Sequence, residues 1–260
     1  MLCPASFMME KDLPPTKSKY ADEGTLLHEL ITIDIRDFLL NQCLNIFDQY
    51  KLPMSYFDKY NECNESNYYF HHLEKVRHVE NKNKDLLIRV VSSFLVLVSR
   101  FNTFNVLLDK RFDLEYLGDN EKGTVDLIIT GYNLDGKFEV HVIDFKFGYG
   151  VKVDAHMNWQ LLNYAKGYIK SKYHTIVDYD LHLHIFQPTF SNSCWSLDEE
   201  EKYKYIISDS IYKRVVNNCK KIEPEFNPSV KACRFCKAKS ICKPLSTTIN
   251  VKQNYTLTVD

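Results

Sequence analysis

The stretch VIDFKFGYGVKVD, residues 142–154, places an aspartate and a lysine two positions apart inside an apolar run. Alternate side chains of a β-strand point to the same face, so Asp144 and Lys146 would lie side by side on one face of a sheet. Burying such charges is costly unless they are paired or hold a metal ion. Taken alone, this pair is more typical of an ion pair on an exposed edge strand, so the surrounding sequence has to decide.

The segments around this stretch predict an α/β fold. Three segments in which apolar and polar residues alternate predict an antiparallel meander: KRFDLEYL (110–117), GTVDLII (123–129) and KFEVHVIDFKF (137–147). The sequence NLDG, between the second and the third segment, predicts a hairpin turn. Helical spacing and renewed alternation predict the flanking elements: helices in residues 23–40 and 154–170, and a strand in residues 180–188. The order is therefore helix, three strands, helix, strand.

Composition and length favour a single globular domain over residues 1–260. The 260 residues are 45% hydrophobic and carry a net charge of −1, which excludes a disordered chain and a strongly basic protein, although not a locally basic groove. We expect a mainly helical insertion at 41–107, a charged amphipathic helix at 197–218 and a cysteine-rich segment at 228–244. The absence of a long apolar run or a secretory signal predicts a cytoplasmic protein without membrane contact.

A second aspartate supports a metal site beside the first one. Asp126 lies in the strand that precedes Asp144 and at a similar height, and neighbouring antiparallel strands can bring two such carboxylates together. The pair would repel unless a divalent cation lay between them, and carboxylate oxygens suit Mg²⁺ or Mn²⁺. Lys146 could then position a water molecule or stabilise charge on a phosphate. This arrangement predicts metal-assisted hydrolysis of phosphodiester bonds.

The motifs GTVD, DFK and QLLNY, in this order, resemble the PD-(D/E)XK nucleases, and within them the phage-associated, RecB-like exonucleases. The resemblance implies a restriction-endonuclease-like core and a DNA exonuclease acting on single-stranded or frayed ends, with a recombination protein as a candidate partner. It also implies the roles of six residues: metal ligands His28, Asp126 and Asp144, catalytic Lys146, and DNA-contacting Gln160 and Tyr164. Taken singly, His28 could be an ordinary core or surface histidine, and Gln160 with Tyr164 an ordinary packing pair.

The cysteines indicate a second cofactor. The segment CRFCKAKSIC supplies Cys233, Cys236 and Cys242, which leaves a four-coordinate site one ligand short. The AddB and CRISPR-associated relatives of the same nuclease branch close a four-iron four-sulfur cluster with one cysteine before the core and three after it, and the resemblance implies Cys3 for that place. Thiolates also suit zinc, which stays open as an alternative metal. Such a cluster would act as a structural staple.

Two other functions remain open on the sequence alone. One is a protein that keeps the nuclease fold and binds nucleic acid, or serves as a scaffold, without cleaving. The other is a structural protein held together by zinc, in which the two carboxylates are incidental.

Overall fold

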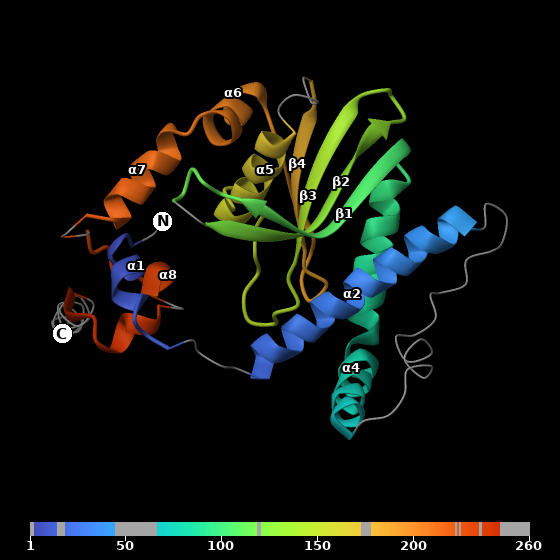
Figure 1. The fold of residues 1–260 in the computed structure, drawn as a ribbon, viewed down its shortest axis with the longest axis horizontal. Coiled ribbons are helices and arrows are strands. Elements are labelled where there is room, and N and C mark those ends of the chain that lie inside the picture. The colour runs from blue at the N-terminus through green and yellow to red at the C-terminus, as the bar shows by residue number, and fades with distance from the viewer. Residues whose placement is uncertain are drawn as a thin grey trace, which may run out of the picture. The chain divides into compact units, whose positions relative to one another are not determined.

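The computed structural model describes residues 3–14, 19–44, 67–118, 121–172, 178–221, 223, 225–233 and 236–244. The chain is a mixed α/β protein built on a five-stranded sheet (Figure 1). Internal contacts group the chain into two compact units. The larger unit comprises Ser18–Leu114 and Asn120–Ile207, and the smaller one comprises Met1–Lys17, Glu115–Asp119 and Ser208–Asp260.

The sheet belongs to the larger unit and has the order β1-β2-β3-β4-β5. Its strands are β1 (Phe101–Asp113), β2 (Lys122–Asn133), β3 (Phe138–Phe145), β4 (Asp180–Phe186) and β5 (Ser193–Leu197). The first three form the predicted antiparallel meander, β4 pairs with β3 in parallel, and β5 pairs with β4 antiparallel. The fifth strand was not predicted. The first strand also begins earlier than expected, within the region that the sequence suggested to be helical.

The turn NLDG between β2 and β3 confirms the predicted hairpin. The Asn133 side-chain oxygen accepts hydrogen bonds from the backbone N–H groups of Asp135 and Lys137, both at 2.9 Å. Gly136 has φ of +77°, a conformation that glycine adopts without the strain that a side chain would bring. The turn fixes the register of the hairpin, whose last pair away from the turn joins Leu127 and Ile143.

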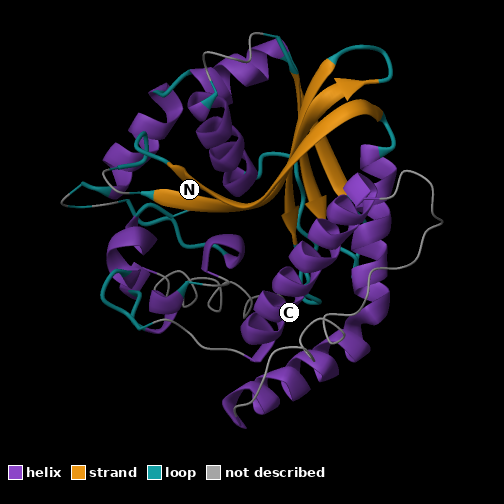
Figure 2. Ribbon diagram, turned by 45° about the vertical axis from the view of Figure 1, so that its right-hand side comes forward, coloured by secondary structure: helices purple, strands orange, loops and turns teal. Residues whose placement is uncertain are grey.

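Helices cover both faces of this sheet (Figures 1 and 2). On one side lie α2 (Lys19–Leu44) and α4 (Asn67–Val98), whose apolar side chains form a core with β1 to β4: Leu27, Ile31, Ile35, Val90, Phe94, Leu127, Ile129, Ile143, Phe145 and Phe186. On the other side lies α5 (Trp159–Ser171), which buries Leu161, Leu162 and Ala165. Residues 45–66 of the expected insertion lie outside the described residues.

Two helix boundaries differ from the sequence prediction. Helix α5 begins at Trp159 and not near Asp154, because the Asn158 side chain accepts the N–H groups of Gln160 and Leu161 and caps the helix there. The single helix expected over 197–218 is divided into α6 (Glu199–Lys202), a π-helical turn (Tyr203–Ile207) and α7 (Ser210–Cys219). The π-turn coincides with a buried hydrogen bond of 2.6 Å from the Lys166 ammonium to the Ile206 carbonyl.

The smaller unit contains α1 (Ala5–Glu10), α7, α8 (Val230–Cys233) and a short 3₁₀-helix (Lys237–Ser240). The cysteine-rich segment and Cys3 both belong to it. Across the described residues of the whole chain, no helix combines the length and apolar character needed to cross a membrane.

Candidate active site and cysteine pocket

Asp126 and Asp144 lie where β2 and β3 stop pairing. Continuing the register by one residue beyond Leu127 and Ile143 sets the two aspartates opposite each other, while the other edge of β3 pairs Asp144 with Ile185 of β4. The Asp126 carboxylate accepts a hydrogen bond of 2.8 Å from the backbone N–H of Phe145. A side chain thus replaces the backbone acceptor at the end of the ladder and holds the carboxylate beside β3.

Lys146 connects this strand end to helix α5. Its ammonium nitrogen lies 2.7 Å from Asp144 Oδ2 and 3.1 Å from the Gln160 side-chain oxygen. The Gln160 amide in turn donates to the Tyr164 hydroxyl at 2.9 Å. The residues predicted for catalysis and for DNA contact are therefore linked in one chain of polar contacts.

Gly123 makes room for Tyr164 over β2. A β-carbon at this position would lie 2.9 Å from the Tyr164 ring, closer than real β-carbons approach a neighbour. The glycine of the GTVD motif therefore allows the tyrosine to lie against the strand that carries Asp126.

His28 approaches the same site from α2. Its Nδ1 lies 3.4 Å from Asp126 Oδ2, and its ring contacts the rings of Phe145 and Phe147. Burial is the main cause that lowers the pKa of His28, with nearby Asp144 acting in the opposite direction. The ring is therefore neutral at pH 7, and neutral imidazole is the form that binds metal ions.

Burial also dominates the ionisation of the two aspartates. It raises the pKa of each carboxyl to about 6, while Lys146 opposes the shift in both. Asp144 is 1% exposed, and its Oδ2 accepts no hydrogen bond of acceptable geometry from the described residues, although the Lys146 ammonium lies close. Two ionised carboxylates and one ammonium leave an excess of one negative charge, which favours a bound cation.

The donor set of this site fits Mg²⁺ or Mn²⁺, since it combines carboxylate oxygens with one imidazole. The three side chains are too far apart in this structure to bind one ion. The ligand atoms of His28, Asp126 and Asp144 do not all lie within 4.8 Å of one another, as judged over the described residues. Binding would require the three side chains to move slightly inward.

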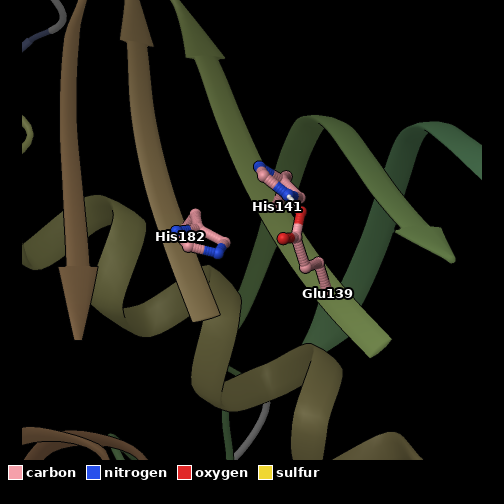
Figure 3. A group of neighbouring side chains, drawn as sticks. All are labelled: Glu139, His141 and His182. Carbon is pink, nitrogen blue, oxygen red and sulfur yellow. Dashed lines mark hydrogen bonds and ion pairs between the residues drawn. The ribbon is translucent and has the colours of Figure 1, made fainter. Parts of the chain in front are cut away.

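A tighter group of ligands was missed by the sequence analysis. Glu139, His141 and His182 bring one ligand atom each within 4.8 Å of one another (Figure 3). The signal was present as alternating polar residues in EVHV and LHLH, but their proximity depends on the pairing of β3 with β4.

The four cysteines predicted to hold a cluster line one pocket of the smaller unit, together with apolar side chains such as Met9 and Phe226: Cys3, Cys233, Cys236 and Cys242. The Cys3 sulfur accepts the backbone N–H of Asn227 at 3.4 Å. Burial, with a hydrogen bond to Glu10, raises the pKa of Cys236. Among the described residues, no three of these sulfurs lie within 4.8 Å of one another.

Comparison with known proteins shows the family of the chain. One solved structure to which the chain is similar is the crystal structure of a "Putative exonuclease" from Eubacterium rectale, which is 13% identical in sequence. The match covers 93% of this chain and 81% of that chain, with a TM-score of 0.42. Another is the crystal structure of SSO0001, which is 12% identical in sequence. That match covers 93% of this chain and 94% of that chain, with a TM-score of 0.30. Both scores are too low to establish a shared fold. A family model described as "Protein of unknown function (DUF2800)" matches residues 1–256, and the chain therefore belongs to the DUF2800 family.

Proposed function

We propose that this protein is a metal-dependent nuclease of the PD-(D/E)XK type that hydrolyses phosphodiester bonds at single-stranded or frayed DNA ends. The observation that carries the proposal is the convergence of Asp126, Asp144 and Lys146 where β2 and β3 stop pairing, with Lys146 in polar contact with Gln160. The sequence order of these residues matches the motifs that resemble this class of nuclease.

His28, Asp126 and Asp144 would hold Mg²⁺ or Mn²⁺ in this proposal. A bound cation of this kind lowers the pKa of water and offsets negative charge on a phosphate. The excess of one negative charge in this buried site supports this role, since Lys146 is the one cation in contact with Asp144 among the described residues and offsets only one of the two carboxylates.

Lys146 would act on the attacking water and on the phosphate. Its side chain is 29% exposed, so its ammonium can reach solvent while contacts to Asp144 and Gln160 restrict its position. A fixed ammonium at this place can orient the attacking water and stabilise the charge that develops on a phosphate oxygen.

Gln160 and Tyr164 would bind the DNA strand. Because the Tyr164 hydroxyl accepts a hydrogen bond from Gln160, its own proton remains available for a phosphate oxygen. Burial raises the pKa of Tyr164, which keeps the hydroxyl protonated and able to donate. Such contacts to phosphate position a strand without reading its bases.

The cysteine pocket would hold a four-iron four-sulfur cluster with a structural role, with zinc as the alternative. Four thiols from the two ends of the chain around one cavity support a metal centre of soft ligands. A tetrahedral zinc ion with bonds of ~2.3 Å would hold its sulfurs about 3.8 Å apart, so the metal content of the purified protein decides between zinc and the larger cluster.

The test is digestion of end-labelled linear and circular single-stranded DNA in Mg²⁺. We expect the wild type to degrade the linear strand and Asp144→Asn to bind the strand without degrading it. Asp135→Asn, at an exposed aspartate in the hairpin turn, is the matched control and should remain active. Binding without cleavage by the wild type, in either Mg²⁺ or Mn²⁺, would favour the scaffold function and contradict the nuclease.

A further inference from the structure

The histidine cluster is separate from the candidate active site. Glu139 and His141 lie two residues apart on β3 and share a face, and His182 is the β4 residue that pairs with His141. Asp144 lies at the end of the same strand and projects from its opposite face, since its position differs from theirs by an odd number of residues. The cluster can therefore bind a ligand without using the carboxylate site.

The three side chains converge in the interior of the larger unit. Glu139 is 4% exposed and His141 is fully buried, and His141 Nε2 lies 2.8 Å from Glu139 Oε2. Figure 3 shows the His182 ring with one nitrogen turned toward the other two residues. His182 Nε2 is buried and has no hydrogen-bond partner among the described residues. A buried nitrogen of this kind usually has a partner, so its position is unexplained by the protein atoms alone.

The second nitrogen of each histidine is held by a neighbour. His182 Nδ1 lies 2.7 Å from the Ser196 hydroxyl, and His141 Nδ1 lies 2.8 Å from His184 Nε2. If both Nδ1 atoms carry the proton and donate it, both Nε2 atoms have a free lone pair. In the absence of a cation, the lone pair of His141 Nε2 would then face the lone pair of Glu139 Oε2 at 2.8 Å, and the two would repel. A proton must therefore lie between these two atoms in the metal-free protein. A metal ion can take the place of that proton.

The carboxylate is held in the same manner. Glu139 Oε1 accepts a hydrogen bond of 2.7 Å from the Asn133 side chain, and the Arg100 guanidinium lies 3.8 Å away. All three candidate ligands therefore have an outer partner that fixes their orientation while one atom of each faces the others. Outer partners of this kind are typical of metal sites in proteins.

We propose that Glu139, His141 and His182 form a binding site for a divalent transition-metal ion, with Zn²⁺ as the best match. Two imidazole nitrogens and one carboxylate are a common zinc ligand set, with bonds of about 2.0–2.2 Å that the three atoms can reach by small movements. An ion at this place would link β3 to β4 and stabilise the parallel pair at the centre of the sheet.

The test is the zinc content of the full chain after chelator treatment, dialysis against micromolar Zn²⁺ and metal analysis. We expect His182→Gln to bind one equivalent less than the wild type. His78→Gln, at an exposed histidine of α4, and Asp144→Asn, in the carboxylate site, should each keep that equivalent. Co²⁺ bound at this site should give a visible spectrum without thiolate charge transfer, which separates it from the cysteine pocket.

Ser196→Ala provides a second variant, since it removes the outer partner of His182 and leaves all three ligands in place. We expect zinc affinity to fall 10- to 100-fold in this variant, as for other losses of outer partners. Zn²⁺ should raise the melting temperature of the wild type and of His78→Gln, and raise that of folded His182→Gln by less. Equal zinc content and equal zinc-induced stabilisation in the wild type, His182→Gln and Ser196→Ala would show a hydrogen-bond network only and overturn the proposal.

Discussion

The carboxylate site and the histidine cluster both use β3, yet they differ in almost every physical property. The carboxylate site lies where strands separate, includes a partly exposed lysine, and its proposed ligands are not yet close enough to share an ion. The histidine cluster lies within the paired strands β3 and β4, and its three ligand atoms lie within 4.8 Å of one another. The first arrangement leaves Lys146 partly open to solvent, whereas the second suits an ion that stays bound.

Burial acts on both sites but with opposite consequences for metal binding. It raises the pKa of Asp126 and Asp144 to about 6, so protons compete with a cation at mildly acidic pH. It lowers the pKa of His141 to about 3 and also lowers the pKa of His182, which favours neutral rings in that range. Mild acid should therefore weaken metal binding at the carboxylates before it affects the histidines.

The largest expected effect is the loss of cleavage on changing Lys146. We expect Lys146→Ala, like Asp144→Ala, to reduce the cleavage rate by about 10³-fold, since a fixed charge is lost where the reaction develops charge. The fold should persist in Asp144→Ala, because removing one of two neighbouring carboxylates relieves repulsion, and in Lys146→Ala, because a carboxyl group with a raised pKa can take up a proton. Initial rates and melting curves measure both effects, with the exposed Lys137→Ala as control. Activity within tenfold of the wild type would remove Lys146 from the site.

Cys3→Ser should have the next largest effect, and it changes a residue of the smaller unit. Three thiolates would leave one iron without a protein ligand, so the anaerobically purified variant should lose the brown colour of the cluster. Loss of a cross-link that closes nearly the whole chain should lower the free energy of unfolding by about 3 kcal/mol or more. Iron analysis and denaturant titration measure these changes.

A colourless wild type with one tightly bound zinc would instead identify a zinc site in the cysteine pocket. Full cluster content in Cys3→Ser would mean that the fourth ligand is a different residue. Cys219, buried in α7, would then be the next candidate.

The pH dependence of stability should separate the two metal sites. Because the folded-state pKa of Asp126 and Asp144 is raised above the unfolded value, the folded protein binds more protons between about pH 4 and 6. Their contribution to stability therefore falls as pH rises through this window in the metal-free protein, and Mg²⁺ should restore it above pH 6. Melting temperatures in EDTA and in Mg²⁺ at pH 5 and 7.5 test this. Equal stabilisation by Mg²⁺ at both values would count against a carboxylate site.

The smallest effect is expected at the DNA-contacting end of the carboxylate site. Tyr164→Phe removes one hydroxyl donor and keeps the ring over Gly123, so we expect DNA binding to weaken by about tenfold while the cleavage rate of bound DNA changes little. Equilibrium binding and single-turnover rates separate the two quantities. Tyr132→Phe, at an exposed tyrosine of β2, should behave as the wild type in both.

The sequence predicted the carboxylate site because all of its strand residues come from one local hairpin. The turn NLDG and the alternation of GTVD and DFK fix the register that brings Asp126 near Asp144. The histidine cluster depends on a parallel pairing of β3 with β4, which are separated in the chain by α5, and no local pattern specifies that register. The division of the 197–218 helix was hidden for the same reason, since Lys166 and Ile206 are distant in sequence.

The metal dependence of cleavage tests the central claim most directly. The wild-type protein should be mixed with end-labelled linear single-stranded DNA in Mg²⁺, in Mn²⁺, in Ca²⁺ and in EDTA, with its fold confirmed by circular dichroism. We predict degradation in Mg²⁺ and Mn²⁺, binding without turnover in Ca²⁺, whose looser coordination shell positions water poorly, and no degradation in EDTA. Degradation that continues at full rate in EDTA, or a folded protein that degrades nothing in either active metal, would contradict the account.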